Sequence, residues 1–217
     1  MAEKSLKYLS GRGWLVLSGG HTSGSPIRAQ ALARARAYGA TAYISLADDS
    51  GDALMDDLED LGARSGYFVD LEYDTPEEMK EQLEAASFIV IEVGSSIDAL
   101  YHALKQEAVM GIRAAYERGA VILIEGLAAN LFGRWILSDG GDLLEGLNWL
   151  ENTFIEPESS GIADSRAVQM VMTRISDAIA VNIMAGSALV LGSDNQVEVW
   201  GQENSVTISL GRSFSSE

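Results

Sequence analysis

Short apolar runs alternate with amphipathic helical stretches through the first two thirds of this chain, and this alternation constrains the fold more than any other feature. The run 87–94 is almost entirely apolar, as expected of a central parallel strand that is buried on both faces. The alternation predicts an α/β protein, a three-layer sandwich in which helices cover both faces of a mainly parallel sheet. We expect strands over 14–18, 41–47, 65–73, 87–94 and 120–125, and helices over 26–39, 51–63, 75–86, 96–104, 107–118 and 127–137.

The last third of the chain has a different pattern. Residues 138–161 are rich in loop-forming residues with one apolar run, and 162–176 has the periodicity of a helix. Short strands separated by Gly, Asn and Asp then predict antiparallel hairpins added to the sheet. We expect a single domain over 1–217, with its core at about 14–209 and flexible ends at 1–12 and 211–217.

Composition excludes several classes of function. The 217 residues include 32 acidic and 15 basic side chains, so a net charge of −17 should repel nucleic acid and anionic membranes. There is no cysteine, which excludes disulfides and thiol catalysis, and no HxH or HExxH spacing suggests a metal. We expect no metal site and no cofactor. Without a signal-like or membrane-length apolar run, the expected location is the cytoplasm.

Ligands of open α/β sheets bind beyond the carboxyl ends of the strands, and four stretches of this sequence should lie there. The glycine-rich stretch 18–25 matches neither a phosphate-binding loop nor a dinucleotide fingerprint, so a tight strand-to-helix turn is its simpler interpretation. The chain has two histidines, His21 and His102, and His21 is the better placed general base because its loop leaves a strand end. The other three stretches are 47–52, 92–98 and 124–130.

The stretch 124–128, Ile-Glu-Gly-Leu-Ala, reads as a buried strand followed by a sharp turn. In a nucleophile elbow the reactive residue sits on such a turn, and here that position is Gly126. Glycine accepts a positive φ without strain, so the turn can form without a serine. Its backbone amides would still be available to an anion or a carbonyl.

The order of these features resembles the cyanophycinase and aspartyl dipeptidase (peptidase E) serine peptidases, which share the flavodoxin-like fold of class I glutamine amidotransferases. The resemblance covers roughly 14–209 and implies that fold. It rests on the segments "LVLSGG", "LADDSGD", "PEEMKEQLEAASFIVIEVGSS", "GIRAAYERGAVILIEGLAAN" and "DAIAVNIMAGSALVL" followed by "VEVWG".

The catalytic residues of this family do not carry over. Its elbow reads Gly-Thr-Ser-Ala-Gly, and the serine position falls on Gly126. The family's strand-end motif corresponds to residues 93–96, which lack its glutamine. The position of the family's histidine falls within 155–160, where this chain has no histidine. Its late Asp-Glu pair is replaced by Asn182-Ile183. The resemblance therefore implies the fold and argues against the activity.

Three hypotheses follow. The leading one is a non-catalytic relative of these peptidases that binds a peptide, an amino acid derivative, another small molecule or a protein partner in the vestigial pocket. The second is an active serine hydrolase with relocated groups, drawn from His21, Ser95, Ser96 and Glu125. The third is a structural or assembly protein without a ligand, and a homodimer is compatible with all three. The expected pocket residues are Gly19, Gly20, His21, Gly94, Ser95, Ser96, Glu125, Gly126 and Leu127.

Overall fold

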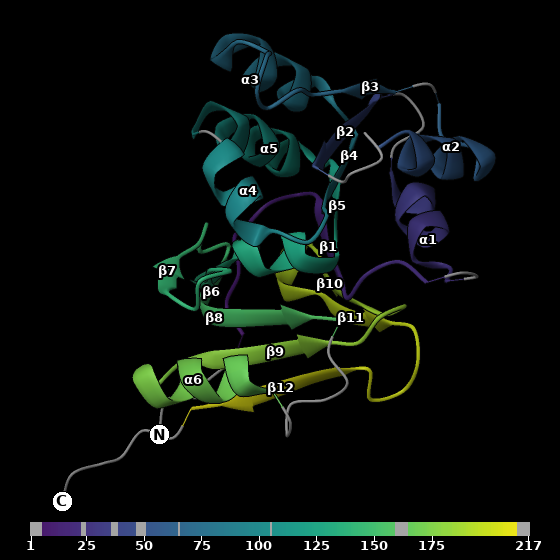
Figure 1. Ribbon diagram of the computed structural model, residues 1–217. Coiled ribbons are helices and arrows are strands. Elements are labelled where there is room, and N and C mark those ends of the chain that lie inside the picture. Colours follow the sequence, from purple (N-terminus) through teal and green to yellow (C-terminus); the bar gives the residue numbers. More distant parts are fainter. Residues whose placement is uncertain are drawn as a thin grey trace, which may run out of the picture.

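Two β-sheets and the helices around them make up the molecule (Figure 1). The computed structural model describes residues 6–22, 25–35, 39–46, 51–64, 66–104, 106–158 and 165–211. Within these residues one sheet has seven strands and the other has five. The predicted α/β class, a mainly parallel sheet with added antiparallel strands, is confirmed.

The larger sheet contains the parallel strands predicted from the first half of the chain. They are β1 (Trp14–Ser18), β2 (Thr41–Leu46), β3 (Tyr67–Phe68), β4 (Phe88–Val93) and β5 (Val121–Glu125). Two antiparallel strands, β10 (Ala188–Leu191) and β11 (Val197–Trp200), extend the sheet next to β1. The spatial order is β11-β10-β1-β5-β4-β2-β3, so the carboxyl ends of the five parallel strands lie along one edge.

Helices cover both faces of this sheet. On one face, α1 (Ile27–Arg34) and α2 (Asp52–Asp60) pack against alternate strand residues such as Val90 and Leu123. On the other face, the intervening residues Ile91 and Ile124 belong to the core formed with α3 (Pro76–Ala85), α4 (Ile97–Ala103) and α5 (Gln106–Arg118). Because successive strand residues point to opposite covered faces, β4 and β5 are apolar at consecutive positions.

The smaller sheet runs in the order β12-β9-β8-β6-β7. Its central strands are parallel and its two outer strands are antiparallel to their neighbours. One face packs against α6 (Arg166–Arg174), and the opposite face contributes Ile155 and Val181 to the main core. The strands are β6 (Gly133–Leu137), β7 (Leu143–Glu145), β8 (Leu150–Pro157), β9 (Ile179–Ile183) and β12 (Val206–Leu210).

The predicted helix at 127–137 is wrong. The chain forms a 3₁₀ helix, η1 (Gly126–Phe132), and then enters β6. At Gly133 a Cβ would lie 2.5 Å from the carbonyl oxygen of Thr153, so only a glycine lets the backbone approach β8 this closely. Trp135 then pairs with Phe154 across the two strands. Strand pairing with a distant segment thus overrides the local helical periodicity.

Two further expectations about the last third need correction. The region 138–161 contains strands β7 and β8, where mainly loop was expected, since pairing with β6 stabilises both. The C-terminal strands are confirmed, but only β10 and β11 join the larger sheet, whereas β9 and β12 pair in the smaller one. A short 3₁₀ helix, η3 (Ser193–Asn195), connects β10 to β11.

Several element boundaries differ from the expected ones. Helix α1 is shorter than the predicted 26–39, and residues 36–38 lie outside the described residues, as do 162–164 of the predicted helix 162–176. In place of a strand over 65–73, β3 has two residues, because the Asp70 carboxylate accepts hydrogen bonds from the backbone of the turn that follows. None of the helices among the described residues is long and apolar enough to cross a membrane.

Candidate functional site

The loops that follow β1, β5 and β4 meet at the carboxyl edge of the larger sheet, whereas residues 47–50 of the predicted stretch 47–52 lie outside the described residues. Because β5 lies between β1 and β4, the loop at Gly19 and Gly20 and the loop at Gly94 flank the turn at Gly126. The predicted pocket residues therefore belong to neighbouring strand ends. This is the edge at which open α/β sheets bind ligands.

Gly126 forms the expected sharp turn. Strand β5 ends at Glu125, η1 begins at Gly126, and the φ of Gly126 is +56°, in the left-handed region. Glycine adopts this conformation without the cost that other L-residues incur. Gly126 is buried, and the next residue, Leu127, is half-buried.

A carboxylate lies against the turn. A Cβ at Gly126 would be 2.6 Å from Oε1 of Glu158, and a Cβ at Gly20 would be 3.1 Å from the same atom. Glu158 follows Pro157, the last residue of β8; it has a positive φ of 59°, and its side chain is exposed. The space that a side chain at Gly126 would enter is thus occupied by Glu158. This contact was not predicted, although it lies within 155–160, the segment to which the resemblance assigned the family histidine.

A buried ion pair takes up the side chain of Glu125. The guanidinium of Arg28 donates from Nη2 to Oε2 of Glu125 at 2.6 Å and from Nε to both carboxylate oxygens at 3.1 and 3.2 Å. Only 7% of Arg28 and 4% of Glu125 are exposed, so neither group is solvated by bulk water. This bidentate pair connects the start of α1 to the end of β5.

Two more carboxylates surround the same guanidinium. Nη1 of Arg28 donates to Asp57 at 2.9 Å, and Nη2 lies 3.9 Å from the carboxylate of Glu92. Burial by itself would lower the pKa of Arg28, but the hydrogen bonds and negative charge of Glu125 and Asp57 outweigh it and raise the pKa. Three carboxylates face one cation here, so the strand-end edge is formally negative.

Sequence reasoning missed Arg28, Asp57 and Glu92. One signal was available for Arg28, because it precedes Ala31 by three residues and so shares a helix face with a buried position. No local pattern marks Asp57 or Glu92. Their roles depend on the strand order, which brings α2 and β4 next to the start of α1.

The two candidate serines are placed differently. Ser96 caps α4 by accepting a hydrogen bond from the backbone N–H of Ala99, and its hydroxyl donates to Asp139 at 2.6 Å. Ser95 is exposed, and the backbone N–H of Gly94 donates to Leu46 at the end of β2. Ser96 therefore has a structural role at this helix end.

Both histidines are exposed. Among the described residues, no hydrogen bond joins His21 to Ser95, Ser96 or Glu125. The ring of His102 packs edge-on against Tyr101. The described geometry thus brings the nine predicted residues to one edge of the sheet without linking a serine, a histidine and an acid.

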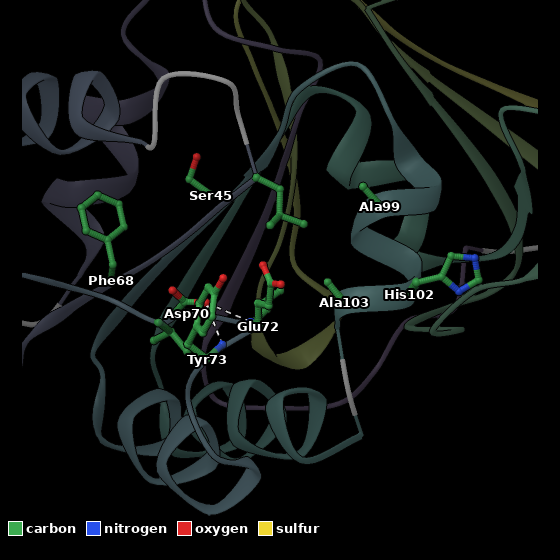
Figure 2. A pocket seen from close by; sticks show the side chains of 11 residues that line it. Ser45, Phe68, Asp70, Glu72, Tyr73, Ala99, His102 and Ala103 are labelled. Carbon is green, nitrogen blue, oxygen red and sulfur yellow. Dashed lines mark hydrogen bonds between the residues drawn. The ribbon is translucent and has the colours of Figure 1, made fainter.

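An open cavity lies further along the same edge, beyond β2. It has a volume of about 680 Å³ and lies between the ends of β2 and β3 and helix α4 (Figure 2). None of the nine predicted pocket residues lines it. The lining residues are Ser45, Leu46, Phe68, Val69, Asp70, Leu71, Glu72, Tyr73, Ala99, His102 and Ala103.

Within the described residues there is no group of three or more His, Asp or Glu side chains with the geometry of a metal site. The carboxylates around Arg28 satisfy that guanidinium. In chemical terms, the edge offers buried charge pairing, backbone turns with positive φ and an open cavity.

These features define a mixed α/β fold with a flavodoxin-like, mainly parallel sheet, and solved structures share it. A peptidase from an acI-B1 Actinobacterium has a TM-score of 0.67 and 18% identity, with 88% of each chain covered. A putative peptidase E from Listeria monocytogenes EGD-e has a TM-score of 0.64 and 15% identity, covering 88% of this chain and 99% of that chain. The fold is therefore that of peptidase E-like proteins. At the level of sequence, no family model and no curated protein matches the chain.

Proposed function

We propose that this protein is a non-hydrolytic relative of the peptidase E-like proteins, which binds a peptide or an amino acid derivative at the carboxyl edge of its sheet without cleaving it. One observation carries the proposal. Gly126 provides no nucleophile at the strand-to-helix turn, and the carboxylate of Glu158 occupies the space beside it. Covalent catalysis from this turn would need a hydroxyl or thiol there.

The neighbouring groups support the same conclusion. The carboxylate of Glu125 accepts three hydrogen bonds from Arg28, so its charge is already paired. The hydroxyl of Ser96 donates to a carboxylate, and no histidine is hydrogen-bonded to it. A serine nucleophile is activated by an adjacent base that takes its proton, usually a histidine held in place by an acid. Here the acid Asp139 contacts the Ser96 hydroxyl directly, with no histidine between them.

The test is chemical labelling together with turnover. We expect purified wild-type protein to show no reaction with a fluorophosphonate serine probe and no hydrolysis of aspartyl dipeptides or cyanophycin, while a peptidase E assayed in parallel reacts. Labelling of any single serine, located by mass spectrometry, would overturn the proposal.

The hydrolase alternative makes a separate prediction. If His21 served as the base for Ser95 or Ser96, turnover should be measurable and should disappear in His21→Ala. The same variant should leave the fold unchanged, because His21 is exposed and has no hydrogen bond to these serines. Turnover that survives His21→Ala would count against this alternative as well.

A further inference from the structure

We propose that the cavity between β2, β3 and α4 binds a small organic amine, a molecule with an apolar body and one ammonium group. The proposal rests on the proposed non-hydrolytic binding function and adds to it a location and a class of ligand.

The walls are mostly apolar. Leu46 and Phe68 come from the strand ends, and Ala99 and Ala103 form the facing wall on α4. Figure 2 shows the two alanines on one side of the space and Ser45 and Phe68 on the other. Small residues on the helix leave room for a ligand, and the Phe68 ring offers a flat apolar surface. Such a surface favours an aliphatic or aromatic body.

The charges that face the cavity are negative. Asp70 and Glu72 line it, and none of the described residues that line it is a lysine or an arginine. Within the described part of the chain, the Glu72 carboxylate has no hydrogen bond or ion pair, and it points into the space between β3 and α4 (Figure 2). The ring of His102, the remaining basic side chain of the lining, points away from that space.

A short turn holds Glu72 in place. Oδ1 of Asp70 accepts the backbone N–H groups of Glu72 and Tyr73 at 2.9 and 3.0 Å, and Asp74 accepts the N–H of Asp70 at 2.9 Å. Two carboxylates therefore fix the backbone from which Glu72 projects. A preorganised backbone lowers the entropy lost when a ligand binds.

A carboxylate bonded to the lining residue Ser45 adds to the negative field. The hydroxyl of Ser45 donates to Oε1 of Glu92 at 2.8 Å, and Glu92 belongs to the group of three carboxylates around Arg28. An anionic ligand would approach these groups and a chain of net charge −17. A cation would be attracted by both. The volume, about 680 Å³, is in the range of small-molecule sites.

Three probes of similar shape and different charge test the proposal: 2-phenylethylamine, 2-phenylethanol and phenylacetate. We expect the amine to bind most tightly and phenylacetate most weakly in NMR titrations of protein labelled at its alanine methyl groups. The methyl signals of Ala99 and Ala103 should shift on binding. Raising the ionic strength should weaken binding of the amine, because the facing carboxylate is exposed to solvent.

Two variants, each with a matched control, locate the binding. Glu72→Gln should weaken binding of the amine about three- to fivefold, as expected for the loss of an exposed charge pair. Glu81→Gln makes the same charge change on the exposed face of α3 and should have no effect. Ala99→Leu should narrow the cavity at its α4 wall and weaken binding, whereas Ala85→Leu, exposed on α3, should not.

Four outcomes would overturn the proposal. These outcomes are equal binding of all three probes, tighter binding of phenylacetate, no binding of the amine, or amine binding that Ala99→Leu leaves unchanged. These outcomes can be distinguished from a failure of the proposed non-hydrolytic function. That failure would appear as labelling of a serine or as turnover in the absence of any amine.

Discussion

Arg28 and Glu125 are the two residues whose interaction most affects both the fold and the candidate site. Both are almost fully buried, and their bidentate pair joins α1 to the end of β5. A buried ion pair contributes little compared with a well-packed apolar pair, because desolvation offsets the attraction. Removing one partner alone, however, leaves an unpaired buried charge.

We therefore expect Arg28→Met to lower the free energy of unfolding by about 3 kcal/mol or more. The double variant Arg28→Met/Glu125→Leu should recover most of that loss, because the carboxylate it removes is the most deeply buried of the three around Arg28, whereas Asp57 and Glu92 are better solvated. Urea unfolding at pH 7 measures both.

Arg113→Met is the control for this prediction. Arg113 pairs with Glu117 one helical turn away, and both side chains are at least half exposed. Its loss should cost no more than about 0.5 kcal/mol. A loss in Arg28→Met as small as that of the control would contradict the structural role of the pair.

The sequence identified individual residues of the site but not the residues that contact them. The turn at Gly126 could be predicted, because a buried strand, a glycine and small residues occur together. The contact of Glu158 with Gly126 joins residues 32 positions apart in number and depends on how β8 ends. No local pattern contains that information.

Tyr116 connects two elements that are far apart in sequence. It lies near the end of α5, its hydroxyl donates to the carbonyl oxygen of Leu9 at 3.1 Å, and its ring packs against Trp149. The side chain is fully buried. Burial, with a smaller contribution from Tyr8, raises the pKa of Tyr116 to about 12. The N-terminal segment is thereby held against α5 by a phenol that must stay protonated.

The sign of the pH effect follows from this raised pKa. The protonated phenol is favoured in the folded state, so its stabilisation is complete below pH 10 and is lost as the pH rises toward about 12. We expect wild-type protein to lose on the order of 2 kcal/mol more stability between pH 10 and 12 than Tyr116→Phe does. Urea unfolding at several pH values measures the difference.

The control for this experiment is Tyr73→Phe, since Tyr73 is 80% exposed. It should follow the wild-type pH profile. If the free energy of unfolding falls equally with pH in wild type and in Tyr116→Phe, then ionisation of Tyr116 does not destabilise the fold between pH 10 and 12.

The elements themselves were predictable where one physical signal dominated. Apolar runs identified β1, β4 and β5, and the helix predicted over 75–86 was confirmed as α3, which begins with a capping box formed by Thr75 and Glu78. The predictions failed at 127–137, where apolar residues fit a helical period although the segment becomes η1 and β6. Its true state depends on pairing with β8, which a window of the sequence does not include.

The whole molecule has two sheets with a shared core, and each ends at an exposed strand. Edge strands β11 and β12 carry the half-exposed side chains Val197, Val199, Ile208 and Leu210. Strand β12 has no charged side chain, which is unusual for an unprotected edge. In a chain of net charge −17, it is a surface at which two copies can meet with little repulsion.

We therefore expect a homodimer to form through the apolar face of β12, with a native mass of twice the 23.2 kDa chain. Ile208→Lys should give a monomer. Thr207→Lys adds the same charge on the opposite face of the strand and should leave the dimer intact. A wild-type monomer at micromolar concentration in native mass spectrometry would refute this prediction.

The Arg28–Glu125 pair also has a consequence for the turn at Gly126. In the proposed non-hydrolytic protein, Glu125, next to the position of the family nucleophile, has a structural role. Its carboxylate pairs with Arg28 and so holds α1 against the sheet. A serine introduced at position 126 would lie next to an acid that is already paired with Arg28, and among the described residues no hydrogen bond joins His21 to that acid. A nucleophilic site at this turn would therefore need several changes at once, since Gly126 carries no hydroxyl, the Glu158 carboxylate lies against it and Glu125 is already paired with Arg28.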